Sequence, residues 1–208
     1  VPQGVTGAKA FFIKYDFYWK LLVAFLPAAV FGLLFSDAID AMLERVEVVA
    51  ITLVLGGIFM LFCDKIFGKG TKEKMTERNA LMVGLYQCIS MIPGVSRSMA
   101  TIVGGMSQGL TRKAAAEFSF FLAVPTMLAA TAYKLLKLIM DPVQRAVLVD
   151  NMTTLIVGNV VAFIVALLAI KFFIEFVSKY GFKAFGWYRI IVGGAIIVMM
   201  LCGVSLEI

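Results

Sequence analysis

Residues 153–173, TTLIVGNVVAFIVALLAIKFF, decide the fold class of this chain. Lys171, near the end of the stretch, is its only charged residue. A helix needs ~20 mostly apolar residues to cross the hydrocarbon core of a bilayer, and this stretch is long enough. It lacks the apolar/polar alternation of a membrane β-barrel strand. The stretch therefore predicts a transmembrane helix.

The chain contains four further apolar runs that are long enough to cross a bilayer. Of the 208 residues, 62% are hydrophobic and 15% are charged, and the mean hydropathy is +0.97. A soluble domain of this size cannot hide so much apolar surface from water. We expect five crossings, at residues 19–35, 46–63, 118–138, 153–173 and 185–204. The sequence thus predicts an all-α, polytopic membrane protein with a single transmembrane domain over residues 1–208.

A sixth apolar region, residues 80–110, is interrupted near its middle. Pro93-Gly94 breaks the run, and polar side chains follow at Ser96, Arg97, Ser98 and Thr101. Each half is too short to cross a bilayer alone. A helix–break–helix that enters the membrane and returns on the same side fits this pattern better than a continuous span.

The connecting segments differ in charge. Residues 36–47 carry four acidic residues against one arginine, whereas residues 64–78 carry five basic residues against three acidic ones. The positive-inside rule places the basic segments in the cytoplasm, and all five crossings then alternate if the broken region re-enters from that side. No nucleic-acid motif accompanies the basic residues, so we expect membrane lipids and no nucleic acid as partners.

Two short matches predict an internal repeat. Val23-Ala24-Phe25 recurs at residues 161–163, and Leu55-Gly56-Gly57-Ile58 resembles residues 192–195; the two separations differ by one residue. The matched spans run in opposite directions, as in an inverted-topology repeat. The counterparts of the broken region and of the span that starts at residue 118 would fall before Val1. We therefore expect the first re-entrant element and the first span of the fold to be missing from this sequence.

The chemistry of the chain is concentrated around Arg97. An arginine at the membrane centre costs roughly 2.5–3.5 kcal/mol on insertion scales, so it should have an anionic partner. A helix that starts near Ser96 to Ser98 would offer free N–H groups and a positive dipole end, and the hydroxyls of Ser96, Ser98 and Thr101 would converge there. Such a set suits a phosphate or diphosphate. In the alternative reading, Ser96 or Ser98 caps a helix and Arg97 pairs with a structural carboxylate.

Two further polar residues flank this point. Gln87 lies in the preceding half-helix, where it would orient the site or a metal-bound water, or form an interhelical hydrogen bond. Glu117 opens the next span, where it would complement the helix dipole, pair with Arg97 or hold a metal ion.

The motif Pro-Gly-x-Ser-Arg-Ser-x-x-Thr at residues 93–101 resembles that of the undecaprenyl-diphosphate phosphatase family, also named for bacitracin resistance. Gln87-Cys88, the segment 112–120 and Phe185-Gly186-Trp187-Tyr188-Arg189 resemble the family as well. The resemblance extends from about residue 18 to the C-terminus.

This resemblance implies a bacterial inner-membrane enzyme. It would hydrolyse undecaprenyl diphosphate to undecaprenyl phosphate and inorganic phosphate, recycling the carrier lipid for peptidoglycan and cell-wall synthesis. The family implies an inverted-repeat fold with two re-entrant elements and a divalent cation, Mg²⁺ or Ca²⁺. Arg97, Ser96 and Ser98 would be catalytic, and Gly94, Thr101 and Gln87 would bind substrate.

The nucleophile and base stay unassigned. The family's glutamate motif, with its serine and histidine, belongs to the first re-entrant element, so these groups are expected upstream of Val1. The chain contains no histidine and could not by itself be one of the histidine-dependent lipid phosphatases.

Two other functions stay open. Inverted repeats and broken helices at mid-membrane are transporter features, so the chain would alternatively be a polyprenyl-phosphate transporter or flippase. It would otherwise be a non-catalytic fragment. Whether it forms a homodimer is left open.

Overall fold

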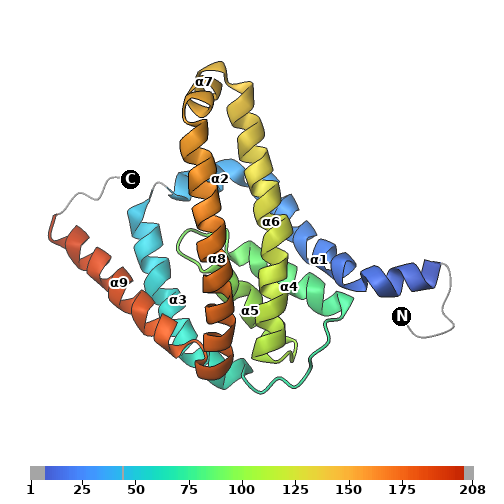
Figure 1. Cartoon of the computed structure of the whole chain (residues 1–208). Coiled ribbons are helices and arrows are strands. Elements are labelled where there is room, and N and C mark those ends of the chain that lie inside the picture. The colour runs from blue at the N-terminus through green and yellow to red at the C-terminus, as the bar shows by residue number, and fades with distance from the viewer. Residues whose placement is uncertain (1–7, 44, 204–208) are drawn as a thin grey trace.

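The computed structural model describes residues 8–43 and 45–203, with side chains from Tyr15 onward, and this part folds into helices without a strand (Figure 1). The helices are α1 Ala8–Leu34, α2 Ser36–Leu43, α3 Val46–Phe67, α4 Glu77–Ile89, α5 Arg97–Ser107, α6 Arg112–Met140, α7 Pro142–Asp150, α8 Met152–Tyr180 and α9 Lys183–Leu201. Five of them, α1, α3, α6, α8 and α9, are long and apolar enough to cross a membrane. The prediction of an all-α, multi-pass membrane protein is therefore confirmed.

The long helices extend beyond the predicted apolar runs. α6 begins at Arg112 and α8 ends at Tyr180, because helical hydrogen bonding continues into polar flanks that hydropathy does not count. The predicted fifth run ended at residue 204, which lies outside the described residues, and α9 ends at Leu201.

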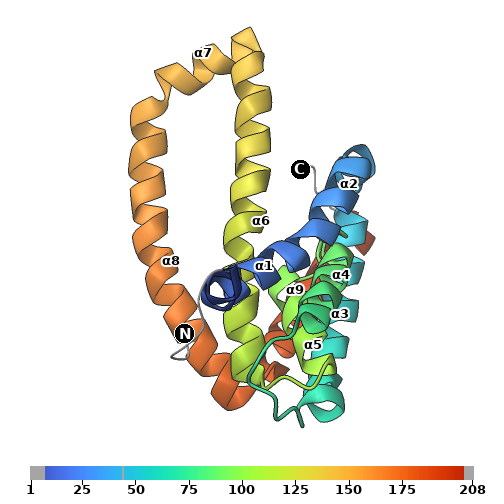
Figure 2. The same ribbon diagram turned by 90° about the vertical axis from the view of Figure 1, so that its right-hand side faces the viewer.

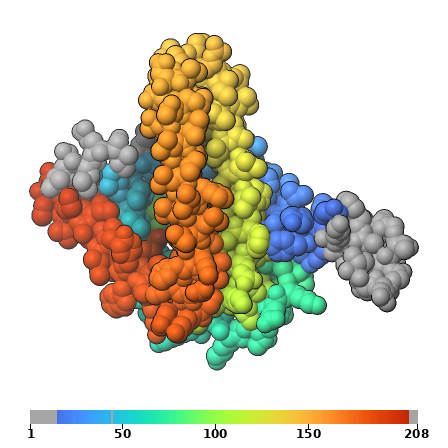
Figure 3. All heavy atoms as spheres, viewed as in Figure 1, coloured from blue at the N-terminus to red at the C-terminus, as the bar shows by residue number. Residues whose placement is uncertain are grey.

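The connections from α1 to α3 and from α6 to α8 fold as short helices, α2 and α7, which the sequence analysis did not predict; α7 lies at the top of Figure 1. Asp141 caps α7 by accepting a hydrogen bond of 2.9 Å from the N–H of Val143, and Pro142 occupies the first turn. α6, α7 and α8 together form a long hairpin that projects beyond the other helices (Figures 2 and 3).

The broken region folds as two short helices, α4 and α5, that pack against each other. With 13 and 11 residues, neither is long enough to cross a bilayer. The two ends of this hairpin meet, because the N–H of Lys72 donates to Gly109 O at 3.0 Å and the N–H of Thr111 donates to Lys72 O at 2.9 Å. The start and the end of the hairpin thus lie next to each other. That the hairpin re-enters a membrane stays a prediction.

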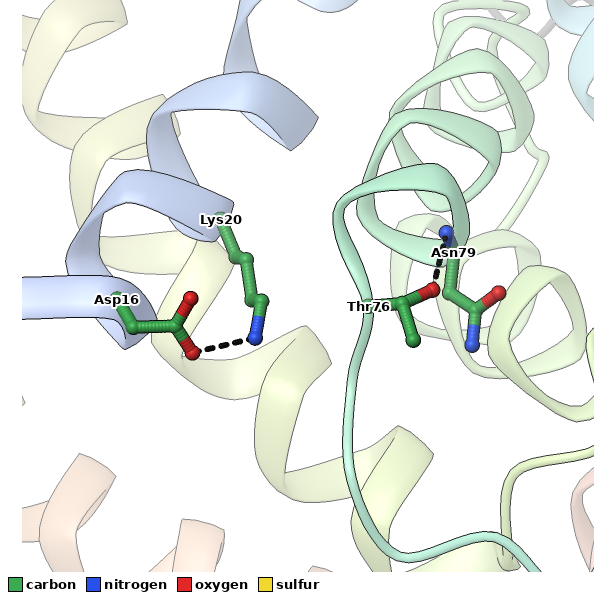
Figure 4. A network of polar contacts seen from close by, with 4 residues as sticks. All are labelled: Asp16, Lys20, Thr76 and Asn79. Carbon is green, nitrogen blue, oxygen red and sulfur yellow. Dashed lines mark hydrogen bonds and ion pairs between the residues drawn. The ribbon is translucent and has the colours of Figure 1, made fainter. Parts of the chain in front are cut away.

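Local contacts fix the start of this hairpin (Figure 4). Thr76 caps α4, and its Oγ1 accepts a hydrogen bond of 3.2 Å from the N–H of Asn79. On the neighbouring α1, Lys20 and Asp16 form an ion pair one helical turn apart.

The carboxylate of Asp64 connects the end of α3 to the start of α6 and to the segment between α8 and α9. Asp64, near the end of α3, lies 3.0 Å from Arg112 Nε at the start of α6, and it accepts a hydrogen bond of 2.8 Å from the N–H of Phe182 between α8 and α9. Gly181, at a φ of +72°, leaves room for this carboxylate, since a Cβ atom there would overlap it. Asp64 therefore ties together the helix ends that surround the α4–α5 hairpin.

Burial differs sharply among the helices. All residues of α5 from Met99 to Met106 are buried, whereas α8 is exposed over most of its length and carries large apolar side chains such as Phe163 and Leu168 on its surface. A helix with such an outer surface suits a lipid environment rather than water. The short helix α5, which follows the break at Pro93-Gly94, is therefore the centre of the fold.

Helices α3 and α9 pack antiparallel through glycines. A Cβ atom on Gly57 would lie 2.8 Å from the carbonyl oxygen of Gly186, and one on Gly193 would lie 3.0 Å from that of Ala50. Small residues let membrane helices approach closely, and here they bring the backbones together. The predicted inverted repeat pairs these two helices, and the repeat itself stays a prediction.

Gly57→Ala should destabilise the protein because its methyl group would meet the backbone of α9. We expect a cost of about 1–3 kcal/mol, the range for overpacking, measured as a lower Tm in detergent. Gly158→Ala on the exposed α8 is the matched control, since no atom lies within 4 Å of its added Cβ. Alanine favours a helix over glycine, so the control should melt at or slightly above the wild-type temperature. Equal melting of both variants would contradict tight α3–α9 packing.

Candidate functional site

The turn between α4 and α5 lies close against α3. Gly94 in this turn has a φ of +83°, a conformation that favours glycine. A Cβ atom there would overlap Thr52 Oγ1 and lie 2.7 Å from the carbonyl oxygen of Val49. Only glycine fits this position, so its place in the motif has a backbone reason. The substrate-binding role of Gly94 stays a prediction.

Two side chains from other helices hold the turn. Thr52 Oγ1 of α3 lies 2.6 Å from the carbonyl oxygen of Pro93, its nearest acceptor. Arg189 Nη2 of α9 donates a hydrogen bond to the carbonyl oxygen of Gly94. The sequence analysis gave neither residue a role; the signal for Arg189 was a basic residue within an apolar span. We call Thr52 and Arg189 the turn clamp.

Arg97 is the first residue of α5 and lies partly buried beneath the turn. Its Nη2 donates a hydrogen bond of 3.1 Å to the carbonyl oxygen of Ser119, while its Nη1 is buried without a partner. Within residues 8–43 and 45–203, no carboxylate forms an ion pair with it, so the alternative of a structural carboxylate partner is not seen. A buried guanidinium nitrogen without an acceptor is costly unless a ligand supplies one.

Thr101 supports Arg97 one helical turn below. Its Oγ1 lies 2.9 Å from the carbonyl oxygen of Arg97 and 2.6 Å from Ser119 Oγ, and both hydroxyl-bearing residues are fully buried. The backbone oxygen of Ser119 in turn accepts from Arg97. Thr101 and Ser119 thus fix α5 against α6 where the guanidinium leaves α5; the sequence analysis did not single out Ser119.

A cavity of about 550 Å³ opens beside Arg97. It lies between α1, α4 and α6 and is lined by Phe25, Ala28, Ala29, Gly32, Leu33, Gln87, Ser90, Met91, Arg97, Thr126, Ala129, Ala130 and Tyr133. Its polar groups gather around Arg97 and Gln87, and its walls along α1 and α6 are mostly apolar.

Gln87 forms the expected interhelical hydrogen bond, and its role in orienting the site or a metal-bound water stays a prediction. Its Nε2 lies 3.4 Å from Thr126 Oγ1, which makes an interhelical hydrogen bond between α4 and α6. Its Oε1 is buried without a hydrogen-bond partner in the described structure, and the residue lines the cavity with Arg97. The amide therefore has an acceptor atom left for a bound group.

The hydroxyls of Ser96 and Ser98 were expected to converge with the Arg97 guanidinium, and this geometry is wrong because they line a different cavity. Ser96 caps α5 by accepting from the N–H of Met99 at 3.3 Å, as the alternative reading held, and its Oγ lies 3.3 Å from Ser98 Oγ. Both serines line a separate cavity of about 160 Å³ between α3, α8 and α9, together with Arg189. Neighbouring residues at a helix start point in different directions, so the turn separates these hydroxyls from the guanidinium.

Glu117 lies apart from Arg97. Its side chain is exposed and lines a third depression, of about 290 Å³, with Lys20, Glu73 and Lys74. In the part of the chain that the structure describes, no three His, Cys, Asp or Glu side chains group as a metal site. A role for Glu117 beside Arg97 or at a metal stays a prediction without support from its placement.

The assembled site is cationic and partly apolar. Arg97 supplies a positive charge at the start of α5, where the helix dipole adds to it. The cavity beside it offers apolar walls that extend along two helices. This arrangement suits an amphiphile with an anionic head group.

Comparison with known proteins agrees with this chemistry. Residues 5–195 match the family described as bacitracin resistance protein BacA. The chain is 58% identical over 206 residues to an undecaprenyl-diphosphatase of Porphyromonas gingivalis, covering 99% of this chain and 73% of that protein. It is 56% identical over 195 residues to that of Flavobacterium psychrophilum, covering 93% and 72%. It is 43% identical over 195 residues to that of Enterococcus faecalis, covering 91% and 68%. The chain belongs to the bacitracin resistance protein BacA family.

Proposed function

We infer that this chain is a membrane phosphatase that hydrolyses undecaprenyl diphosphate. The relatives carry the name undecaprenyl-diphosphatase. The observation that carries the inference is the buried Arg97 Nη1, which lacks an acceptor at the polar end of an otherwise apolar cavity. A lipid with a diphosphate head group would place the diphosphate at the polar end of the cavity and its hydrocarbon chain along the apolar walls. Recycling of the carrier lipid for cell-wall synthesis follows as the role of the reaction.

In this reaction, the oxygen of water forms a bond to the terminal phosphorus. The bond from that phosphorus to the bridging oxygen breaks, and the bridging oxygen stays with the lipid phosphate. Negative charge is held on the phosphoryl oxygens and grows on the leaving oxygen, so fixed positive groups lower the barrier.

Arg97 supplies such a group. Its Nη1 would donate a hydrogen bond to a phosphate oxygen, while its Nη2 continues to donate to the carbonyl oxygen of Ser119. Thr101 keeps the guanidinium in place through its contacts to Arg97 O and Ser119 Oγ. The group that activates the attacking water stays unassigned among the described residues.

A divalent cation is part of the proposal. Mg²⁺ in phosphoryl-transfer sites is commonly held by one or two carboxylates, substrate phosphates and waters. The described lining of the cavity contains no carboxylate, and Gln87 Oε1, buried and without a partner, is the protein oxygen there that would add to phosphate and water ligands. When bound, a cation would neutralise charge on the diphosphate.

The proposal places the protein in the bacterial inner membrane. The α4–α5 hairpin would enter from the cytoplasmic side, where the basic 64–78 connection lies under the positive-inside rule. Arg97 at the tip of the hairpin would then reach into the membrane, with α2 and α7 on the outer side.

Arg97→Ala should lower phosphate release from undecaprenyl diphosphate by about 10²–10³-fold, the usual loss when one transition-state charge group is removed. Inorganic phosphate is measured with the purified protein in detergent, and Arg97→Lys should recover little because lysine lacks the two-nitrogen fork. Arg145→Ala, on the exposed α7, is the matched control and should retain wild-type turnover. Near-normal activity of Arg97→Ala would remove this residue from the site.

Thr52→Val should lower kcat about tenfold, because losing its contact to Pro93 lets the turn and Arg97 shift from the productive position. Thr52→Ser keeps a hydroxyl and should restore most of the turnover. Both are compared with wild type by kcat, KM and Tm. If Thr52→Val lowers kcat only in proportion to a loss of folded protein, or not at all, the turn clamp does not position the site.

Removal of divalent cations with EDTA should abolish phosphate release, and added Mg²⁺ or Ca²⁺ should restore it, because the charge of the diphosphate needs neutralisation. Gln87→Leu, which removes the orphaned amide oxygen, should raise the cation concentration needed for half-maximal rate. Full activity in EDTA would overturn the cation proposal and leave the role of Arg97 intact.

A further inference from the structure

Two helix faces border the cavity beside Arg97 with the same spacing. Phe25, Ala28, Ala29 and Gly32 of α1 follow the i, i+3, i+4, i+7 pattern, and Thr126, Ala129, Ala130 and Tyr133 of α6 follow it too. Residues at this spacing share one face of a helix. The cavity is therefore a cleft between two helix faces, each lining it over about 10 Å at a rise of 1.5 Å per residue. α1 runs obliquely to α6 (Figures 1 and 2).

The middle of each face consists of residues with little or no side chain. Ala28 and Ala29 of α1 and Ala129 and Ala130 of α6 all line the cavity. A Cβ atom added to Gly32 would be in ordinary van der Waals contact with Met91 Cε at 3.6 Å, so any larger side chain there would meet Met91 or enter the cleft. Small residues on both helices thus leave the space that the cavity occupies.

The cleft runs in one direction from the polar end. On α6, Ser119 contacts Arg97, Thr126 contacts Gln87 one step further along, and Tyr133 lies beyond it. The faces therefore lead away from Arg97 toward the end of the molecule that carries α2 and α7 (Figure 1). Ala129 and Ala130 are exposed, so the cleft is open at its side as well as along its length.

We propose that this cleft binds the isoprenoid units next to the diphosphate, and that Gly32, Ala129 and Ala130 determine specificity by keeping it wide. The inference rests on the proposed function, which supplies the diphosphate at Arg97. A methyl-branched isoprenoid is thicker than a straight acyl chain and needs a cleft without projecting side chains. The remainder of a long polyprenyl tail then lies in the surrounding lipid.

A photoreactive polyprenyl diphosphate tests the cleft without relying on turnover. A diazirine in the isoprene unit next to the diphosphate should label α1 and α6 of the protein in liposomes, with the labelled peptides located by mass spectrometry. Ala130→Leu should reduce this labelling at least fivefold. Ala132→Leu is the matched control, because Ala132 lies two residues further on α6, is exposed and does not line the cavity.

Competition identifies the class of lipid that the cleft takes. Unlabelled undecaprenyl diphosphate should displace the probe, whereas a phosphatidic acid with straight acyl chains should not. Labelling confined to other helices, equal competition by both lipids, or equal loss in Ala130→Leu and Ala132→Leu would each overturn the proposal.

Kinetics separate the cleft from the phosphatase proposal. Ala129→Leu and Ala130→Leu should raise the KM for undecaprenyl diphosphate about tenfold while kcat changes little, since a few added carbons block binding and leave Arg97 in place. An unchanged KM in both variants would contradict the proposal that the cleft binds isoprenoid units and would leave the phosphatase proposal standing. A wild-type protein that binds and labels but releases no phosphate contradicts the phosphatase alone.

Discussion

The close approach of the Pro93-Gly94 turn to α3 is the constraint on which the site depends. With any side chain at Gly94, the turn would be pushed away from Thr52 and Val49. α5 follows the turn directly, and its residues from Met99 to Met106 are all buried, so it could not slide to compensate. The position of Arg97 is therefore decided by close backbone packing, together with the contacts of Thr52 and Arg189 to the turn.

A comparison of Arg97 with Arg112 shows how the partners of a partly buried arginine bear on its role. Arg112 lies 3.0 Å from Asp64 and helps to tie three helix ends together. Arg97 has only the carbonyl oxygen of Ser119, and its Nη1 has no acceptor in the described structure. A paired arginine in an apolar protein is explained by structure, whereas an unpaired one lowers stability unless something binds it. The difference between the two supports the proposed role of Arg97 as a ligand group.

The sequence predicted the parts of the fold that depend on hydropathy and on proline. The five crossings and the break at Pro93-Gly94 followed from the need for ~20 apolar residues per span and from the lost N–H of proline. α2 and α7 were missed because short helices in polar connections leave little periodic signal, although Asp141-Pro142 was a local start signal for α7. The motif at residues 93–101 contains Arg97, whose Nη1 is buried without a partner in the described structure, and its role in binding substrate stays a prediction.

The arrangement of the site could not be predicted from spacing alone. Spacing placed Ser96, Arg97 and Ser98 together, but the direction of each side chain depends on how a cap and a first helical residue meet the surrounding helices. The roles of Thr52 and Ser119 depend on contacts between residues 41 and 22 positions apart in the chain. Such contacts arise from tertiary packing, and a single sequence contains no local sign of them.

The turn separates two regions that both carry positive charge. Arg97 faces the cleft between α1 and α6, and Arg189 lies on the other side with Ser96 and Ser98, between α3, α8 and α9. Neither guanidinium has an ion-pair partner in the described part of the chain. Arg189 also holds the turn through Gly94 O, so the group that positions the backbone adds to the local positive potential. A diphosphate carries more negative charge than a lipid monophosphate and is drawn to such a place more strongly, which favours binding of the substrate over retention of the product.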